Sequence, residues 1–263
     1  MATEIEKAFI IRDPDNKTSV KYAKHCKETA GNNIPKNNVE YFDSTSNVKE
    51  MWKKVKKLDI KIKNHGSFTY HENLRITNND EQREKAECIT LAHVCLWKKI
   101  SKMERAAAIL EHDVVWLGKA CARIPDNLIV GLGYKLTNPE IYKVNDRGRD
   151  GPDLWSYEIV YVPKILGAHA YAITPMTAMI LLEEVRVNGV QGFIDCTHFQ
   201  GNPAGYTNVR MGMMSPPPAI CHIRESTIWD EATTRNGYMI ESFTSRLNDP
   251  NKEYFEKLEK RII

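Results

Sequence analysis

Residues 106–113 have the sequence Ala-Ala-Ala-Ile-Leu-Glu-His-Asp. The first five are apolar, and charged side chains stand on both sides of them. A short uninterrupted apolar run of this kind is typical of a strand that is buried on both faces of a sheet. The stretch therefore predicts a central strand that delivers Glu111, His112 and Asp113 to the edge of that sheet.

Further strands and helices alternate along the chain on both sides of this stretch. Short apolar runs predict strands at 8–11, 39–42, 127–130 and 169–173. Apolar residues recurring every three or four positions predict helices at 48–58, 81–103 and 174–189, and a more polar helix is expected at 19–29. The alternation indicates an α/β fold with a mostly parallel central sheet and helices on both faces.

Two other regions give weaker patterns. Residues 137–160 are rich in Asn, Asp, Gly and Arg, which predicts a long insertion loop. Residues from 201 onward have few periodic signals. We expect a lid or tail over the core there, ending in a short helix at 253–261.

Length, charge and cysteine usage narrow the class of protein. The 263 residues fit one large domain, and 37 basic against 34 acidic residues leave a net charge of only +3. No apolar run reaches the length of a membrane span, and no apolar leader begins the chain. Six cysteines without a C-x-x-C pair argue against a zinc site and a disulfide framework. We therefore expect a soluble cytoplasmic protein with reduced thiols.

The acidic pair at the end of the 106–110 run is the first candidate site. In an extended chain Glu111 and Asp113 point the same way, and two converging carboxylates repel each other unless a cation lies between them. Mg²⁺ or Mn²⁺ suits such oxygen ligands and leaves positions open for phosphate oxygens. The alternative is two solvated acids in a turn.

Three segments resemble motifs of glycosyltransferase family 25, which includes lipooligosaccharide and collagen galactosyltransferases. Residues 87–100, ECITLAHVCLWKKI, resemble its Ser-His-x-x-x-Trp helix, and residues 109–114, ILEHDV, resemble the strand Leu-Glu-Asp-Asp-Val that follows it. Residues 167–182, GAHAYAITPMTAMILL, resemble its Gly-x-x-Ala-Tyr-x-Ile segment and the helix after it. The resemblance covers about 85–115 and 165–196, and it is weak elsewhere.

The resemblance implies a single domain of the Rossmann-like glycosyltransferase-A fold. Residues 1–135 would form the half that binds the nucleotide sugar, and residues 136–263 would form the acceptor half with a C-terminal lid or tail. The implied enzyme is an inverting hexosyl- or pentosyltransferase that uses a UDP-sugar and Mn²⁺ or Mg²⁺. The sequence does not indicate an oligomeric state.

Roles for individual residues follow from the same resemblance. The metal ligands would be Glu111, Asp113 and His222, and Asp195 would be the general base that deprotonates the acceptor. Ile10, Arg12, His112 and Arg224 would contact the donor, and Thr174, Glu225 and Ser226 the acceptor. Plainer alternatives are left open for three of these residues: Asp195 as a group that only orients a backbone group or a cation, His222 as a surface histidine, and Arg224 as a salt-bridged arginine. His93 is expected to be a core histidine.

Three positions depart from the family pattern. His112 replaces the middle acid, Ala92 replaces the serine before His93, and Met176-Thr177 stand where a glycine is common. A degenerate scaffold without catalytic activity, binding nucleic acid, is therefore an alternative to an active enzyme.

The acceptor is left open by the sequence. Seven lysines lie between Lys49 and Lys63, against the acids Glu50 and Asp59. Such a face suits the phosphate backbone of DNA, which favours a viral enzyme that modifies a hydroxymethylated pyrimidine. A saccharide acceptor in surface-glycan synthesis is the alternative, with the lysines facing solvent or an anionic membrane surface.

Overall fold

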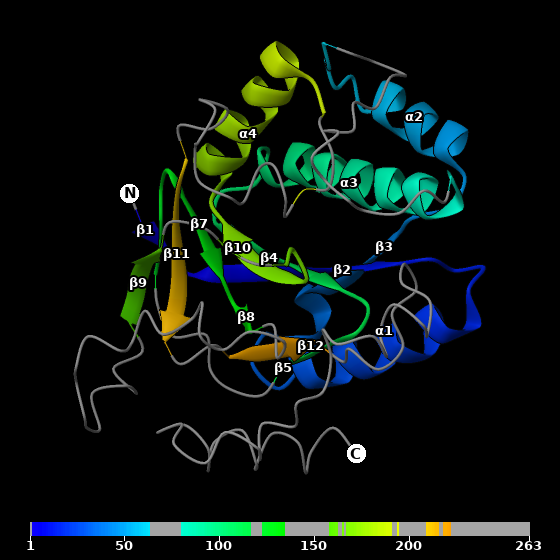
Figure 1. Cartoon of the computed structure of the whole chain (residues 1–263). Coiled ribbons are helices and arrows are strands. Elements are labelled where there is room, and N and C mark those ends of the chain that lie inside the picture. Colours follow the sequence, from blue (N-terminus) through cyan, green and yellow to red (C-terminus); the bar gives the residue numbers. More distant parts are fainter. Residues whose placement is uncertain are drawn as a thin grey trace, which may run out of the picture.

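The computed structural model describes residues 2–63, 80–116, 123–134, 158–162, 165, 167–190, 194, 209–215 and 218–221. Within these ranges the chain is a mixed α/β protein, in which helices lie above and below a twisted central sheet (Figure 1). The helices are α1 (Lys17–Ala30), α2 (Val48–Lys57), α3 (Asp80–Ile100) and α4 (Pro175–Asn188), with a 3-10 turn η1 (Lys36–Asn38).

The central sheet has seven strands in the order β3-β2-β4-β10-β7-β11-β9. Their bounds are β2 Ile5–Arg12, β3 Val39–Asp43, β4 Ala106–Glu111, β7 Leu128–Gly131, β9 Glu158–Val162, β10 Ala170–Ile173 and β11 Arg210–Ser215. Two smaller sheets pair β1 (Ala2–Thr3) with β6 (Ile124–Pro125), and β12 (Ala219–Cys221) with β5 (Val114–Trp116) and β8 (Gly133–Tyr134).

The strand directions are mixed, so the sheet is less parallel than the sequence predicts. β3, β2 and β4 are parallel, whereas β10 runs antiparallel to both of its neighbours, β4 and β7. β11 is parallel to β7, and β9 is antiparallel to β11. The mixed α/β class is confirmed, and both predicted halves of the chain contribute strands to the same sheet.

Alternate residues of each strand face opposite layers, as strand geometry requires. Ala8 and Ile10 of β2 pack in one buried cluster with the inner side of α1, whereas Phe9 and Ile11 pack in a second cluster with α2 and α3. Of the described helices, α1 covers one face, and α2, α3 and α4 cover the other (Figure 1). The prediction of helices on both faces is confirmed.

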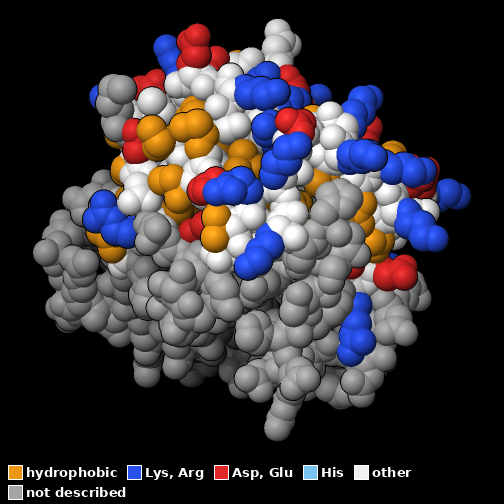
Figure 2. Space-filling model, turned by 90° about the horizontal axis from the view of Figure 1, so that it is seen from above, with side chains coloured by type: hydrophobic (Ala, Val, Ile, Leu, Met, Phe, Trp, Pro, Cys, Tyr) orange, Lys and Arg blue, Asp and Glu red, His pale blue; other side chains and the backbone are white. Residues whose placement is uncertain are grey.

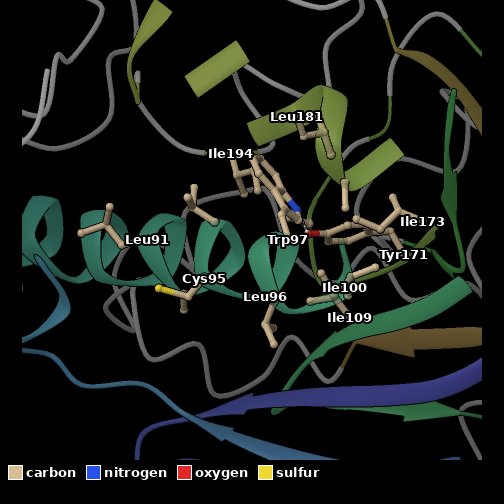
Figure 3. Close-up of a cluster of buried hydrophobic side chains, with 14 of the residues drawn as sticks. Leu91, Cys95, Leu96, Trp97, Ile100, Ile109, Tyr171, Ile173, Leu181 and Ile194 are labelled. Carbon is tan, nitrogen blue, oxygen red and sulfur yellow. Dashed lines mark hydrogen bonds between the residues drawn. The ribbon is translucent and has the colours of Figure 1, made fainter. Parts of the chain in front are cut away.

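The layer under α3 holds the largest buried side chains. Trp97 and Ile100 of α3 pack on Ile109 of β4 and Tyr171 of β10, and Leu181 of α4 closes the cluster (Figure 3). Each of these five side chains is fully buried. The cluster fixes α3 and α4 to the sheet through apolar contact, which stabilises a fold in proportion to the apolar area removed from water.

Polar caps set where three helices begin. The side chains of Asn16, Asn47 and Thr174 accept hydrogen bonds from backbone N–H groups in the first turns of α1, α2 and α4. Pro175 occupies the first turn of α4, as predicted, and Gly189 ends that helix with a φ of 81°.

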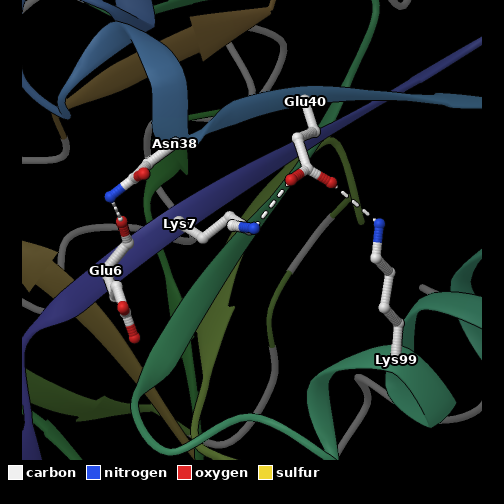
Figure 4. Close-up of polar contacts among 5 residues, drawn as sticks. All are labelled: Glu6, Lys7, Asn38, Glu40 and Lys99. Carbon is white, nitrogen blue, oxygen red and sulfur yellow. Dashed lines mark hydrogen bonds and ion pairs between the residues drawn. The ribbon is translucent and has the colours of Figure 1, made fainter.

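An ion-pair cluster ties the edge strand β3 to its neighbours (Figure 4). Glu40 of β3 accepts from Lys7 Nζ of β2 at 2.7 Å and from Lys99 Nζ of α3 at 2.8 Å. Asn38 Nδ2 donates to the carbonyl oxygen of Glu6 at 3.0 Å. These contacts lie at the rim of the α3 layer.

The later part of the chain differs most from the prediction. The segment after residue 201 is not only a lid or tail, because β11 is an inner strand of the central sheet. Residues 158–160 of the predicted 137–160 loop belong to β9. The rest of that loop and the predicted helix at 253–261 lie outside the described residues. Among the helices described, none is long and apolar enough to cross a membrane.

Candidate functional site

A cavity of about 370 Å³ lies where β2, β3 and β4 end. Because these strands are parallel, their carboxyl ends meet at one edge of the sheet, which is where open α/β sheets bind ligands. The loops after the three strands and the outward side of α3 supply the lining residues: Ile11, Arg12, Asp13, Asp15, Asn16, Ser19, Ser44, Thr45, Ser46, Lys85, Cys88, Ile89, Glu111, His112 and Asp113.

Arg12 is held in place at the end of β2. Its Nε donates to Asp43 Oδ1 at 2.6 Å, and its guanidinium carbon lies 3.9 Å from the centre of the Tyr41 ring. Both contacts come from the neighbouring strand β3. The guanidinium is therefore pre-oriented at the cavity, and its terminal nitrogens are the donors available for a ligand.

The loop from β2 into α1 is organised by hydrogen bonds to side chains. The backbone N–H of Asp13 donates to Ser19 Oγ at 2.9 Å, and the N–H of Ser19 donates to Asn16 Oδ1 at 3.1 Å. The N–H of Asp15 donates to Asp13 Oδ1 at 3.0 Å. The side chains of this loop form part of the cavity wall.

The acidic triplet follows β4, as predicted, but its local geometry differs. β4 ends at Glu111, and His112 and Asp113 form a turn before β5. The alternation of an extended chain, from which the sequence predicts that Glu111 and Asp113 point the same way, does not hold across this turn. All three residues nevertheless line the cavity. Asp113 lies near α1, where burial and then the charge of Asp113 raise the pKa of Cys26.

Glu111 approaches the cavity from the α3 layer. Its Oε1 lies 3.6 Å from His93 Nε2, and its backbone N–H donates to the carbonyl oxygen of His169 at 2.7 Å. Burial acts to raise the pKa of Glu111, but His93, with His169 and His112 nearby, outweighs burial, so the pKa is lowered. Glu111 is therefore ionised at neutral pH although its side chain is only 24% exposed.

The donor set of this cavity fits a hard divalent cation. Glu111 and Asp113 offer carboxylate oxygens, and Mg²⁺ is usually bound through one or two carboxylates plus substrate phosphates and water. Within the described ranges no three His, Cys, Asp or Glu side chains form a ready metal cage. The remaining ligands would thus come from substrate or water, or from a residue outside these ranges such as His222.

Cysteine chemistry does not suit the cavity. Cys88 lines it, and burial, followed by the charges of Glu87 and Glu84, raises the pKa of its thiol to about 12. A thiol in that state is a poor nucleophile at neutral pH.

Two of the predicted contact residues lie away from the cavity. Ile10 is fully buried in the layer under α1 and does not line the cavity, whereas its neighbour Ile11 does. Thr174 is fully buried as the cap of α4. Because β10 is antiparallel to β4, Ile173 pairs with Ala107, which places Thr174 at the opposite edge of the sheet from Glu111. Thr174 therefore does not join this cavity, and the acceptor contact expected of it stays a prediction.

The predicted residues Asp195, His222, Arg224, Glu225 and Ser226 lie outside the described residues. The structure thus brings together Arg12, Glu111, His112 and Asp113 at the cavity, and the roles expected of the other five stay predictions.

Two histidines that the sequence analysis gave no role at the site lie beside Glu111. His93 belongs to α3 and is fully buried, and His169 precedes β10. The signal that would have found His169 is the antiparallel pairing of β10 with β4, which sets the start of β10 against the end of β4. A mostly parallel sheet predicts the reverse.

The lysine-rich surface lies on the helical layer above the sheet (Figure 2). Lys53 pairs with Glu50 at 2.7 Å and Lys61 with Asp59 at 2.6 Å, whereas no ion pair joins Lys49, Lys56, Lys57 or Lys63 to any residue in the described part of the chain. Lys56, Lys61, Lys63 and Arg186 line a second cavity of about 470 Å³, which shares no residue with the first.

Trp52 does not take part in this surface. It is buried, and its Nε1–H donates to Glu87 Oε1 at 2.8 Å. It is therefore not available to stack on a base.

Comparison with known proteins identifies no relative: neither the models of known families nor the curated proteins give a match to this chain.

Proposed function

We propose that this protein is a metal-dependent glycosyltransferase that moves a sugar from a UDP-sugar to an acceptor hydroxyl. Two things support the proposal: the resemblance of residues 87–114 and 167–182 to family 25 motifs, and the position and charge of the cavity at the ends of β2, β3 and β4.

The balance of charge in this cavity carries the proposal. Among the described residues that line it, Asp13, Asp15, Glu111 and Asp113 are acidic and Arg12 and Lys85 are basic, and Asp43 already pairs with Arg12. A nucleoside diphosphate would be repelled by this excess of carboxylates unless a cation accompanied it. The cavity is therefore suited to a diphosphate that binds together with a divalent ion.

The chain's own residues have distinct parts in such a reaction. Glu111 and Asp113 would hold Mn²⁺ or Mg²⁺, with His222 as a further ligand. The ion would neutralise the charge that develops on the departing diphosphate. Arg12, fixed by Asp43 and Tyr41, would orient the nucleoside, and Arg224 would contact a phosphate.

The acceptor hydroxyl would lose its proton to Asp195 on the face opposite the leaving group, which inverts the configuration of the transferred sugar. Glu225 and Ser226 remain candidates for holding the acceptor. We propose a cytoplasmic enzyme, in the host cell if the chain is viral.

The acceptor that we favour is a hydroxymethylated pyrimidine in DNA. Lys49, Lys56, Lys57 and Lys63 have no ion pair within the described ranges, and clustered lysines suit a phosphate backbone. A saccharide acceptor is the alternative, and the same assay separates the two.

The test is release of nucleoside diphosphate from a panel of nucleotide sugars with Mn²⁺. Each donor is offered with no acceptor, with duplex DNA containing 5-hydroxymethylcytosine, and with a simple galactoside or heptoside. Stimulation by the modified duplex supports a DNA-modifying enzyme, and stimulation by the saccharide alone supports glycan synthesis. No release in any reaction favours the degenerate scaffold that binds nucleic acid.

Asp113→Asn tests the cation site in the same assay. Loss of one electrostatic stabilising group from an active site costs about 100- to 1000-fold in kcat, and we expect a loss of that size here. Asp59→Asn is the matched control, because Asp59 lies outside this cavity and has a φ of 50°, which Asn tolerates. Equal activity of the two variants would remove the cation site from the proposal.

A further inference from the structure

Three buried residues from the motif-like segments meet behind Glu111. His93 and Trp97 belong to α3, four residues apart on the same side of the helix, and Tyr171 belongs to β10. All three side chains are fully buried. The indole nitrogen of Trp97 points at the Tyr171 hydroxyl (Figure 3), and His93 contacts the same hydroxyl from the next turn of the helix.

The hydrogen bonds in this group have a direction. Trp97 Nε1–H, which can only donate, lies 2.9 Å from Tyr171 Oη. Burial raises the pKa of Tyr171 well above its usual range, so the hydroxyl keeps its proton. His93 Nδ1 lies 2.9 Å from the same oxygen. At this distance His93 Nδ1 can accept the hydroxyl proton if the ring carries its own proton on Nε2.

The surroundings of the other ring nitrogen of His93 also bear on its tautomer. His93 Nε2 is buried and has no hydrogen-bond partner among the described residues, and Glu111 Oε1 lies 3.6 Å from it. A nitrogen lone pair facing a carboxylate would be repelled, whereas an N–H facing it is attracted. The approach of Glu111 thus favours the tautomer with the proton on Nε2, and the contact of Nδ1 with the Tyr171 hydroxyl is compatible with it.

We infer that Trp97, Tyr171 and His93 form a hydrogen-bonded chain that holds His93 in its Nε2–H tautomer, so that His93 positions the Glu111 carboxylate for a divalent cation. The inference rests on the proposed function for the identity of the ligand. His93 is a positioning residue, because it acts through Glu111 and does not line the cavity.

The hydrogen-bonded chain of Trp97, Tyr171 and His93 would restrict the position of the Glu111 carboxylate. An N–H held by its ring to face one oxygen of a ligating carboxylate attracts that oxygen and so restricts where the other oxygen lies. Glu111 follows the last buried residue of β4, so its backbone is fixed by the sheet, and His93 fixes the rest of its side chain.

The first test is the tautomer itself, which requires no substrate. Long-range ¹H–¹⁵N correlation spectra of the full chain show which ring nitrogen of a histidine carries the proton, and loss of one signal set in His93→Gln assigns His93. We expect a protonated Nε2 and a bare Nδ1 in the wild type, and loss of this fixed pattern in Tyr171→Phe. A proton on Nδ1 in the wild type would overturn the inference.

The second test separates positioning from packing. In His93→Gln the amide nitrogen replaces Nε2, and in His93→Asn it replaces only Nδ1, while both variants remove the imidazole from the core. Loss of a residue that orients a metal ligand typically costs about 10- to 100-fold in metal affinity. We expect that loss for His93→Asn and substantial rescue by His93→Gln, measured by the decrease in the electron paramagnetic resonance signal of free Mn²⁺.

The outcomes separate this inference from the proposed function. Equal Mn²⁺ affinities of the wild type and both folded variants would overturn the positioning role and leave the glycosyltransferase proposal intact. Equal losses in both variants would also overturn it, because they indicate packing alone. Absence of Mn²⁺ binding in the wild type, together with no release of nucleoside diphosphate, would overturn the cation site and the proposed function together, whatever tautomer His93 has.

Discussion

The two faces of the central sheet are built differently. Toward α1, the adjacent strands β2, β4 and β10 present mainly alanine: Ala8, Ala106, Ala108, Ala170 and Ala172. Toward α3, the same strands present Phe9, Ile109 and Tyr171, and the layer contains the hydrogen bonds of Tyr171 to Trp97 and His93. One face therefore allows a helix to lie close to the strands, and the other carries bulk and polar contacts.

The contrast between the two faces shows that the contacts behind Glu111 come from the face toward α3. Neighbours in sequence have different tasks: Ala170 packs under α1, whereas Tyr171 bonds to the histidine beside Glu111. On the face toward α3, hydrogen bonds among buried polar groups restrict the orientation of the side chains. On the face toward α1, the small alanines set how closely the helix packs on the strands.

Exchanging two neighbouring residues of β4 tests most strongly whether the two faces require side chains of different size. Ala108→Ile combined with Ile109→Ala keeps the composition but puts bulk under α1 and a void under α3. A buried Ile→Ala change costs about 2–5 kcal/mol, and overpacking costs about 1–3 kcal/mol. We expect the double variant to lose roughly 3–8 kcal/mol of unfolding free energy in urea titrations, enough to unfold many domains.

The two single variants are the controls for this exchange. If the faces are independent, each is more stable than the double variant. A double variant more stable than either single one would mean that the sheet shifts to compensate, and the contrast between the faces would be lost.

The α3 face also depends on how α4 begins, which gives a smaller effect. Thr174 Oγ1 accepts from the N–H of Thr177 at 3.2 Å. Thr174→Ala removes this cap and should cost about 0.5–2 kcal/mol of stability, because cap removal typically has that effect. Thr174→Ser keeps the oxygen and should recover most of it. Unfolding of both variants is followed by circular dichroism. Loss of acceptor affinity in Thr174→Ala at unchanged stability would contradict a capping role alone and support a binding role for Thr174.

The smallest expected effect is at the rim of the α3 face. Hydrogen bonds from Lys7 and then Lys99 lower the pKa of Glu40 from its ordinary value of 4.5. A lowered folded-state pKa contributes stability above about pH 4.5 that is lost as the pH falls through the lower value. Since Glu40 is partly exposed, we expect Glu40→Gln to lower the free energy of unfolding by at most about 1 kcal/mol at pH 7. We also expect the stability of the variant to change less than that of the wild type as the pH falls below about 4.5.

Glu6→Gln is the matched control for Glu40→Gln. Glu6 lies on the adjacent strand, and its side chain forms no ion pair with a described residue (Figure 4). An equal loss in both variants, at pH 7 and at pH 3, would show that the Lys7–Glu40–Lys99 contacts add nothing.

Several elements of the fold could be predicted because their sequence signals are local. The apolar run at 106–110 is β4, the spacing from Val48 to Leu58 is α2, and Thr174-Pro175 starts α4. β11 was missed because RMGMMS is not an obvious strand pattern and its neighbours in the sheet, β7 and β9, are distant along the chain. Pairing between distant segments leaves little trace in a single sequence.

The candidate site was predictable in the same measure. Glu111, His112, Asp113 and Arg12 follow strands in the chain, so their common edge follows from parallel order. His93 and His169 reach that edge through the antiparallel β10 and through the packing of α3, which the sequence does not specify. The placement of Thr174 away from the cavity has the same origin.

The proposed function depends above all on the cavity binding a nucleoside diphosphate together with a divalent cation. Isothermal titration of UDP into the full chain, with Mn²⁺ and then with a chelator, tests it directly. The account predicts binding with Mn²⁺, its loss with the chelator, and its loss in Asp113→Asn but not in Asp59→Asn. Binding of equal affinity with the chelator, or no binding of UDP with Mn²⁺, would contradict it.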